Sequence, residues 1–276
     1  MDPKPHTKIR PDRGWARPDL RELWNYRDLL YILVWRDIKV RYKQTALGAA
    51  WALLQPLVAM LVFTFFLGTL AHVPSDGIPY PVFAYSGLLL WQFFSRALTE
   101  ASLSLVVNER VITKVYFPRL LVPASVVLAG VMDFTIAFIL LLALMAVYGL
   151  GMSWTIFLAP VFVLLAMAAA LGISFWLSAL DVKYRDVRYT LPFLTQIWLF
   201  ATPVVYPSSL VPEWLRPWYG LNPLVGVVEG FRWSLLGVAA APNVAMMCIS
   251  TAVVGLVLVG GILYFRAMEQ TLADLI

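Results

Sequence analysis

The stretch RYKQTALGAAWALLQP, residues 41–56, marks the point at which this chain changes its surroundings. It opens with the cations Arg41 and Lys43 and then runs apolar, without a charge, up to and beyond Pro56. Over the whole chain, 61% of the 276 residues are hydrophobic and 13% are charged, whereas a globular domain carries about 25% charged residues. Because so few polar side chains cannot cover a water-facing surface, the composition predicts an integral membrane protein with its boundary at residues 41–47.

The apolar stretches predict six transmembrane helices in one membrane domain, since each helix that crosses the hydrocarbon needs roughly 20 apolar residues. Two glycines in GLGMSW, residues 149–154, divide the longest apolar region. The stretches 105–119 and 181–189 are too charged to cross. The predicted spans are residues 49–71, 82–104, 120–147, 155–180, 190–205 and 244–265.

Residues 207–243, between the last two spans, fit neither a span nor a soluble loop. They are rich in Trp, Tyr, Pro and Gly. Aromatic rings favour headgroup depth, and backbone that does not span is tolerated in a membrane where protein or water covers it. We therefore predict an all-α integral membrane protein with six transmembrane helices, an amphipathic interfacial helix near the N-terminus and a re-entrant helical pair between spans five and six.

Lys and Arg residues are enriched in short cytoplasmic loops, and their distribution orients the chain. The stretches before span one and after spans two, four and six hold 11, 3, 3 and 1 of them, and the stretches after spans one, three and five hold 0, 0 and 2. Both termini are therefore expected in the cytoplasm and the re-entrant segment outside. The predicted domains are a cytoplasmic N-terminus (1–47), a membrane domain (48–265) and a cytoplasmic C-terminus (266–276). Charges scattered through the first 20 residues leave no apolar core for a cleaved signal.

Residues 23–43 are expected to form the interfacial helix. Tyr31, Trp35, Ile38 and Tyr42 recur at steps of four, three and four, which places them on one helical face. The cations lie opposite, and each adds about 1 kcal/mol of attraction to anionic lipid. They are Arg27, Arg36, Lys39, Arg41 and Lys43. The helix could serve only as a membrane tether, and the alternation of its last eight residues also allows a strand.

The stretch NERVITKVYFPRLLVP, residues 108–123, is either a plain loop or a short helix suited to a groove in another protein. The sequence contains no GxxxxGK[ST] phosphate loop, no HExxH motif and no paired cysteines, because Cys248 is the single cysteine. We therefore expect a chain without catalytic residues, metal site or bound cofactor, which takes its energy from elsewhere.

Two charges fall inside predicted spans, where a charge near the bilayer centre costs at least about 2.5 kcal/mol. Asp133 lies 13 residues into span three, or about 20 Å at 1.5 Å per residue. Arg96 lies in the inner half of span two, which runs antiparallel to span three. Arg96 is expected either to contact Asp133, or to extend towards the cytoplasm or pair with Glu100 one turn away.

Four stretches of the chain, in this order, resemble a known family: RYKQTALGAAWALLQP (41–56), VNERVITKVYFPRLLVPASV (107–126), DVKYRDVRYTLPFLTQIWLFATPVVYP (181–207) and LNPLVGVVEGFRWSLLG (221–237). Together they resemble the permease subunit of polysaccharide exporters in the type-2 class of ABC transporters. The O-antigen exporters are the most similar group, with capsule and teichoic acid exporters as relatives. The resemblance covers nearly the whole chain after residue 20.

This resemblance implies a half-transporter in the bacterial inner membrane. Two copies meet around a pore, and each docks one separate ATPase subunit that carries ATP and Mg²⁺. The stretch 105–119 then serves as a coupling helix in a groove of the ATPase. The residues that inherit this role are Glu109, Arg110, Lys114, Tyr116 and Arg119.

For the cargo, the resemblance implies an undecaprenyl-type lipid-linked polysaccharide and no nucleic acid. The helix at 23–43 gates lateral access of this lipid, with Arg41, Tyr42 and Lys43 at its pyrophosphate, and the re-entrant pair caps the pore outside. Sugar rings present apolar CH faces that stack on aromatic side chains, although each such side chain could instead pack against lipid or protein. The candidate pore aromatics are Trp91, Phe94, Trp198, Phe200 and Tyr206.

Two other classes of protein compete with this interpretation. A secondary transporter driven by an ion gradient usually has repeated halves and several carboxylates near the midplane, whereas only Asp133 qualifies in this chain. A membrane-embedded transferase would need clustered acids or histidines at one membrane face. The predicted outer loops contain only Asp76, Glu213 and Glu229 as acids.

Overall fold

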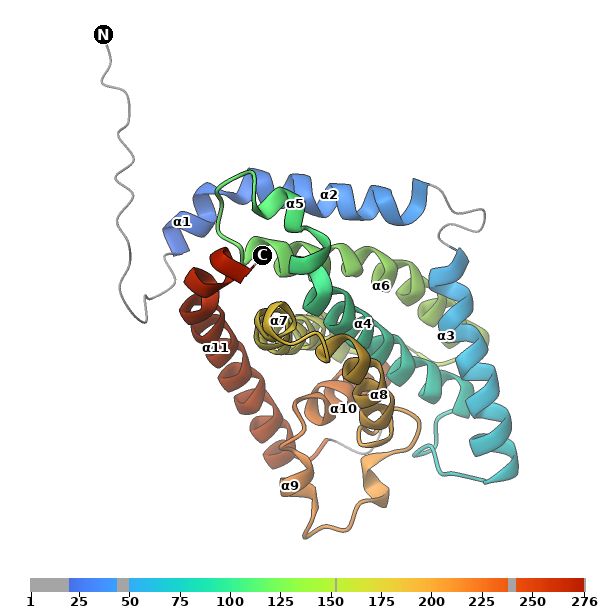
Figure 1. Cartoon of the computed structure of the whole chain (residues 1–276). Coiled ribbons are helices and arrows are strands. Elements are labelled where there is room, and N and C mark those ends of the chain that lie inside the picture. Colours follow the sequence, from blue (N-terminus) through green and yellow to red (C-terminus); the bar gives the residue numbers. More distant parts are fainter. Residues whose placement is uncertain (1–19, 44–49, 152, 238–241, 276) are drawn as a thin grey trace.

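The structure of this chain is a computed structural model that describes residues 20–43, 50–151, 153–237 and 242–275. All the regular elements in these residues are helices (Figure 1), so the predicted all-α class is confirmed. A π-helical turn at Thr64–Leu70 extends α3, and 3₁₀ turns lie at Trp154–Leu158 and Ser208–Leu210. The α-helices are α1 (Leu20–Asn25), α2 (Arg27–Lys43), α3 (Ala50–Phe63), α4 (Tyr80–Val107), α5 (Glu109–Ile112), α6 (Leu121–Val147), α7 (Ala159–Lys183), α8 (Val187–Phe200), α9 (Arg216–Tyr219), α10 (Pro223–Leu236) and α11 (Val244–Leu275).

Four helices are long and apolar enough to cross a membrane, and they match predicted spans one, three, four and six. They are Ala50–Leu70, Leu121–Val147, Trp154–Lys183 and Val244–Glu269. The second predicted span is the 28-residue α4, whose polar and charged residues lower its hydropathy. The fifth is α8, whose 14 residues extend about 21 Å at 1.5 Å per residue. Spans two and five therefore remain predictions as membrane crossings.

The central helix of the fold is α4. Most of its side chains between Val82 and Leu105 are buried, because α3, α6, α7, α8 and α10 all pack against it. The Phe93 and Phe134 rings meet edge-on with centroids 5.5 Å apart, which joins α4 to α6. The Tyr85 hydroxyl donates to the Ala137 carbonyl oxygen at 3.0 Å and so satisfies a polar atom in the core.

Helices α7 and α11 pack backbone to backbone. A Cβ added at Gly172 would lie 2.7 Å from the Leu258 Cα, and one added at Gly261 would lie 2.2 Å from the Gly172 carbonyl oxygen. Small residues allow this close approach, which is the usual basis of helix packing in membranes. The stacked rings of Trp176 and Tyr264, with centroids 4.6 Å apart, extend the contact.

At one end of the bundle, α2 lies across the other helices (Figure 1). Its Leu33 belongs to a hydrophobic cluster with Ile112 of α5, Phe117, Phe175 of α7 and Phe265 of α11. The helix is continuous from Arg27 to Lys43, so the alternative of a strand at its end is wrong. Residues 1–19 and 44–49, which hold the predicted boundary between the first two domains, lie outside the described residues.

The structure shows which side chains of α2 turn towards the bundle. Tyr31 and Trp35 are exposed by 68% and 49%, whereas the Arg41 side chain is only 15% exposed. Asp37 also faces inward and accepts a hydrogen bond from the Ser125 hydroxyl of α6 at 3.1 Å. Arg41 is therefore separated from the outward cations, because partners on α4 and α6 favour its inward position.

At the opposite end, the segment after α8 forms the single turn α9 and the 14-residue α10. The Asn222 side chain caps α10 by accepting from the Leu224 N–H at 3.1 Å. Within α10, the buried Arg232 donates to the Val204 and Pro203 carbonyl oxygens at 2.9 and 3.2 Å, which satisfies the backbone where the chain leaves α8. Re-entry of this segment into the membrane remains a prediction, and residues 238–241 lie outside the described residues.

Candidate functional site

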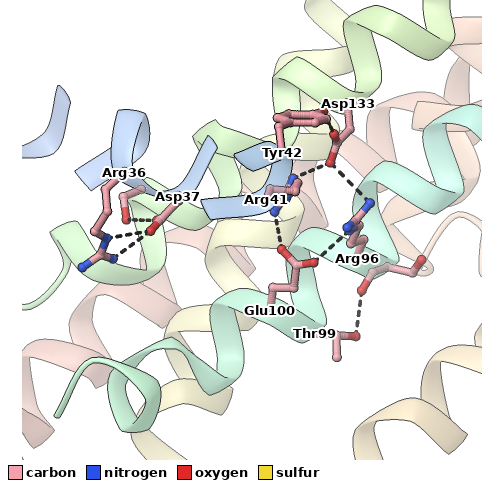
Figure 2. Close-up of polar contacts among 10 residues, drawn as sticks. Arg36, Asp37, Arg41, Tyr42, Arg96, Thr99, Glu100 and Asp133 are labelled. Atoms are coloured by element: carbon pink, nitrogen blue, oxygen red, sulfur yellow. Dashed lines mark hydrogen bonds and ion pairs between the residues drawn. The ribbon is translucent and has the colours of Figure 1, made fainter. Parts of the chain in front are cut away.

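Charged side chains from three helices meet beneath the end of α2, in an arrangement that we call the charge network (Figure 2). Its members are Arg41 and Tyr42 of α2, Arg96 and Glu100 of α4, and Asp133 of α6. One guanidinium nitrogen of Arg41 donates to Asp133 and the other donates to Glu100. The Tyr42 hydroxyl donates to the second oxygen of Asp133. The end of α2 is thus attached to both α4 and α6.

Arg96 makes both contacts that the sequence left as alternatives. Its Nε donates to Glu100 Oε1 at 2.8 Å, as the spacing of one helical turn allows. Its Nη1 lies 3.3 Å from Asp133 Oδ2. The two alternatives are compatible because Glu100 and Asp133 lie on either side of the same guanidinium.

The charge network contains two cations and two anions, so its formal charges cancel. Asp133 and Arg41 are 13% and 15% exposed, whereas Glu100 and Arg96 are 37% and 43% exposed. Removing one partner would leave a charge uncompensated in a poorly solvated place, which costs more than the intact pair gains. Burial and the hydrogen bond to Asp133 raise the pKa of Tyr42 to about 12, so its hydroxyl remains a donor at neutral pH.

Two cavities meet at the charge network. The first, which we call the bundle cavity, has a volume of about 370 Å³ and lies between α3, α4, α6 and α8. The second, which we call the α2 groove, has a volume of about 540 Å³ and lies between α2 and α4. Arg41, Arg96 and Glu100 line both of them. The charge network therefore forms the partition between a groove at the end of the bundle and a cavity inside it.

Polar side chains that sequence reasoning missed line the bundle cavity. The signal was present in span two, where polar residues recur at helical spacing from Gln92 to Thr99 and so occupy one face of α4. Amide and hydroxyl groups on such a face can exchange hydrogen bonds with water or with a hydroxylated ligand. The polar uncharged residues that line the cavity are Gln55, Gln92, Ser95, Thr99 and Thr195.

Residues 28–236 of this sequence match the family described as ABC-2 type transporter. This chain belongs to that family. The match includes the charge network, the bundle cavity and helices α3 to α10.

Relatives of this ABC-2 chain are named for polysaccharide transport. The O-antigen export system permease protein RfbA of Myxococcus xanthus is 35% identical over 216 residues, which cover 77% of this chain and 82% of the relative. A protein of the same name from Klebsiella pneumoniae is 26% identical over 252 residues, covering 90% and 95%. The polysialic acid transport protein KpsM of Escherichia coli is 24% identical over 249 residues, covering 86% and 92%.

The residues expected at a lipid pyrophosphate do not form one open cluster in this ABC-2 chain. Arg41 and Tyr42 are engaged with Asp133 and Glu100 inside the charge network. Lys43 is exposed at the end of α2. An anion that bound Arg41 would therefore have to compete with two carboxylates.

The predicted coupling residues lie between α4 and α6, and most of them are exposed. The helical part is shorter than expected, because α4 continues to Val107 and α5 has only four residues. Arg119 differs from the rest of the set: it is half-buried and bonded to Glu269 of α11. The exposed members are Glu109, Arg110, Lys114 and Tyr116.

The predicted pore aromatics fall in different environments. Trp91 and Phe94 are 6% and 0% exposed and belong to the core of this ABC-2 chain, where both rings pack edge-on against Trp198. Phe200 is 58% exposed. The Tyr206 hydroxyl is engaged with the Phe200 carbonyl oxygen at 2.7 Å. The aromatic rings that line the bundle cavity belong instead to Phe93 and Phe134.

Proposed function

We propose that this chain is the membrane half of an ATP-driven exporter that moves a lipid-linked polysaccharide of the O-antigen type out of the cytoplasm. The observation that carries the proposal is the similarity to export permeases over 82–95% of their own length. The bundle cavity, lined by amide, hydroxyl and aromatic groups, suits sugars, because aromatic faces take apolar CH groups while polar side chains exchange hydrogen bonds with hydroxyls. Capsular polysaccharide is the second candidate cargo, favoured by the similarity to the polysialic acid transport protein.

The proposed assembly contains two copies of this chain and two ATPase subunits in the bacterial inner membrane. ATP and Mg²⁺ bind to the ATPase subunits. The chain crosses the membrane six times with both termini in the cytoplasm, α2 lies in the cytoplasmic interface, and α9 and α10 re-enter from outside. Four exposed residues between α4 and α6 support an ATPase-docking role for that segment, namely Glu109, Arg110, Lys114 and Tyr116.

The proposed route begins at the α2 groove. An undecaprenyl-type lipid lies along its apolar residues Val40, Leu103 and Val107. The lipid pyrophosphate replaces the carboxylates at Arg41, with Lys43 at the exposed end of α2. Displacement of Arg41 removes the partition, and the sugar chain then passes along the bundle cavity.

The test is co-expression of this chain with its ATPase subunit, purification of the complex and measurement of ATP turnover with and without lipid-linked polysaccharide. The expected result is a stable complex of two copies of each subunit whose turnover rises with the lipid-linked polymer. A chain that binds no ATPase subunit, or a complex indifferent to every lipid-linked polymer tested, would overturn the proposal.

A further inference from the structure

The segment that precedes α6 is bonded to the end of α11. The Arg119 backbone N–H donates to Glu269 Oε1 at 3.1 Å, and the Arg119 Nη1 donates to the Glu269 carbonyl oxygen at 2.9 Å. The other carboxylate oxygen of Glu269 accepts from Arg266 Nη1 at 3.2 Å. We call this set of three residues the α11 clamp.

The α11 clamp is better placed to transmit force than an ordinary surface ion pair. The Glu269 and Arg266 side chains are 21% and 15% exposed, and hydrogen bonds to ionised groups are about twice as strong as neutral ones. Because Glu269 holds a backbone N–H, it fixes the main chain directly after Phe117 and Pro118, which are both buried. Residues 109–116, which are exposed apart from Ile112, therefore lead into a main chain that is fixed to α11.

Helix α11 is itself fixed along its length. Its backbone packs so closely on α7 at Gly172 and Gly261 that an added Cβ would find no room at either position. Near its other end, the Ser250 hydroxyl accepts from the Gly226 N–H of α10 at 3.0 Å and lies 2.9 Å from the Asn222 carbonyl oxygen. Ser250 and Glu269 lie 19 residues apart, so α11 connects points about 28 Å apart.

We propose that Glu269 is a positioning residue that couples residues 109–119 to α11, and through α11 to α10 at the opposite end of the bundle. This inference rests on the proposed function, in which the ATPase subunit docks on the segment between α4 and α6, and it adds that the docked subunit moves residues 109–119. A displacement of that segment pulls on α11 through the α11 clamp. Because α11 holds α10 at Ser250, the same displacement reaches α9 and α10.

The first test replaces Glu269 with alanine in the complex with the ATPase subunit. E269A is expected to bind the ATPase subunit and hydrolyse ATP at the basal rate. It should lower polymer exported per ATP by about fivefold or more, the lower end of typical coupling factors between sites. The matched control is E213A, because Glu213 also pairs with an arginine three residues away but is 90% exposed. Equal export per ATP in E269A and E213A would overturn the proposal.

The second test reports on the far end directly. Trp218, which is 68% exposed on α9, is replaced with cysteine and labelled with an environment-sensitive fluorophore. The exposed free cysteine Cys248 is changed to serine so that only residue 218 is labelled. The fluorescence change caused by ATP should be present with native Glu269 and lost in E269A. An unchanged response in E269A would contradict the proposal.

A cross-linking experiment distinguishes a loss of coupling from a loss of stability. It also tests the proposal if the E269A protein does not accumulate in cells. Arg119→Cys and Glu269→Cys are combined in the Cys248→Ser background. Export per ATP should be low before treatment with a short bifunctional thiol reagent and should recover after it. Efficient cross-linking without recovery would refute the role of the α11 clamp. If the unmodified chain bound no ATPase subunit at all, the proposed function would fail instead, and that result is distinct from these.

Discussion

At the scale of single residues, the decisive feature is that two arginines of the charge network share the same two carboxylate partners. Arg41 and Arg96 each contact the carboxylates of Glu100 and Asp133, and the Tyr42 hydroxyl donates a hydrogen bond to Asp133. Asp133 therefore accepts hydrogen bonds from two side chains of α2 and forms an ion pair with Arg96 of α4. Within the charge network, Arg96 and Glu100 form the one contact between residues of the same helix, and every other contact joins two helices.

The first prediction concerns Asp133→Asn, which removes one negative charge and leaves Arg41 and Arg96 sharing Glu100. The free energy of unfolding in detergent should fall by about 3 kcal/mol, the lower end of the cost of breaking a buried ion pair. Thermal or denaturant unfolding of the purified chain measures it. The control is Asp28→Asn, since Asp28 is 89% exposed and 3.8 Å from Arg27. An equal loss in both variants would contradict the prediction.

The second prediction follows from the raised pKa of Tyr42, about 12 against an ordinary value of about 10. The protonated hydroxyl is favoured in the folded state, so its stabilisation is fully present below pH 10 and is lost as the pH rises from 10 to 12. Tyr42→Phe removes this contribution at every pH. The stability difference between native protein and variant should therefore be constant from pH 7 to 9 and shrink above pH 10. A difference that grows above pH 10 would reverse the argument.

At the scale of elements, the sequence predicted where helices begin and end better than it predicted which face of each helix is buried. Predicted span boundaries fall close to the ends of three helical stretches, Ala50–Leu70, Leu121–Val147 and Trp154–Lys183, and to the start of α11, because the length of an apolar stretch is set by the bilayer. Which side of each helix turns inward was harder to predict, because lipid and protein core are both apolar. For this reason Trp91 and Phe94 are buried while Phe200 is exposed, although all three belong to apolar stretches.

Helix α2 illustrates the same limit, whereas the polar face of α4 does not. Periodicity correctly predicted that residues 27–43 are helical, but the partners of Arg41 lie 59 and 92 residues away in the sequence. Such pairings depend on how helices are arranged, which a single sequence without homologues does not encode locally. The polar residues of α4, by contrast, share one face by spacing alone, so the bundle cavity was within reach of prediction.

The third prediction belongs to the packing of α7 on α11. Gly261→Ala places a Cβ 2.2 Å from the Gly172 carbonyl oxygen, and overpacking of this kind typically costs about 1–3 kcal/mol. Gly255→Ala on the same helix is the control, because a Cβ there meets nothing within 4 Å. That control should be neutral or should stabilise by up to about 1 kcal/mol through helix propensity. Unfolding in detergent should separate the two variants, and similar midpoints would contradict the close packing.

At the scale of the whole molecule, the charge network lies between the α2 groove and the bundle cavity. The α2 groove opens at the end that carries α2, α5 and the α11 clamp, and the bundle cavity lies deeper between α3, α4, α6 and α8. The far end carries α9 and α10, which α11 joins to the α2 end (Figure 1). Access to the bundle cavity from the α2 end therefore depends on where Arg41 lies.

The fourth prediction is that Arg41→Ala opens this partition. A cysteine at Thr99, in the Cys248→Ser background, should react several-fold faster with a membrane-impermeant thiol reagent when Arg41 is replaced. The experiment uses inverted vesicles, in which the cytoplasmic side faces the reagent. Lys39→Ala, an exposed position on the same helix, serves as the control. Equal rates with and without Arg41 would show that the charge network does not restrict access.

The charge balance of the network also favours the arrangement in which α2 lies on the bundle. When α2 lifts away with Arg41, it carries one positive charge and leaves Arg96, Glu100 and Asp133 with one net negative charge. Two unit charges 4 Å apart attract by about 4 kcal/mol in surroundings with an effective dielectric constant of 20. Separation of α2 therefore works against a restoring force. In the proposed route, the shut arrangement would return once the incoming anion had moved on, so opening would need energy and closing would need none.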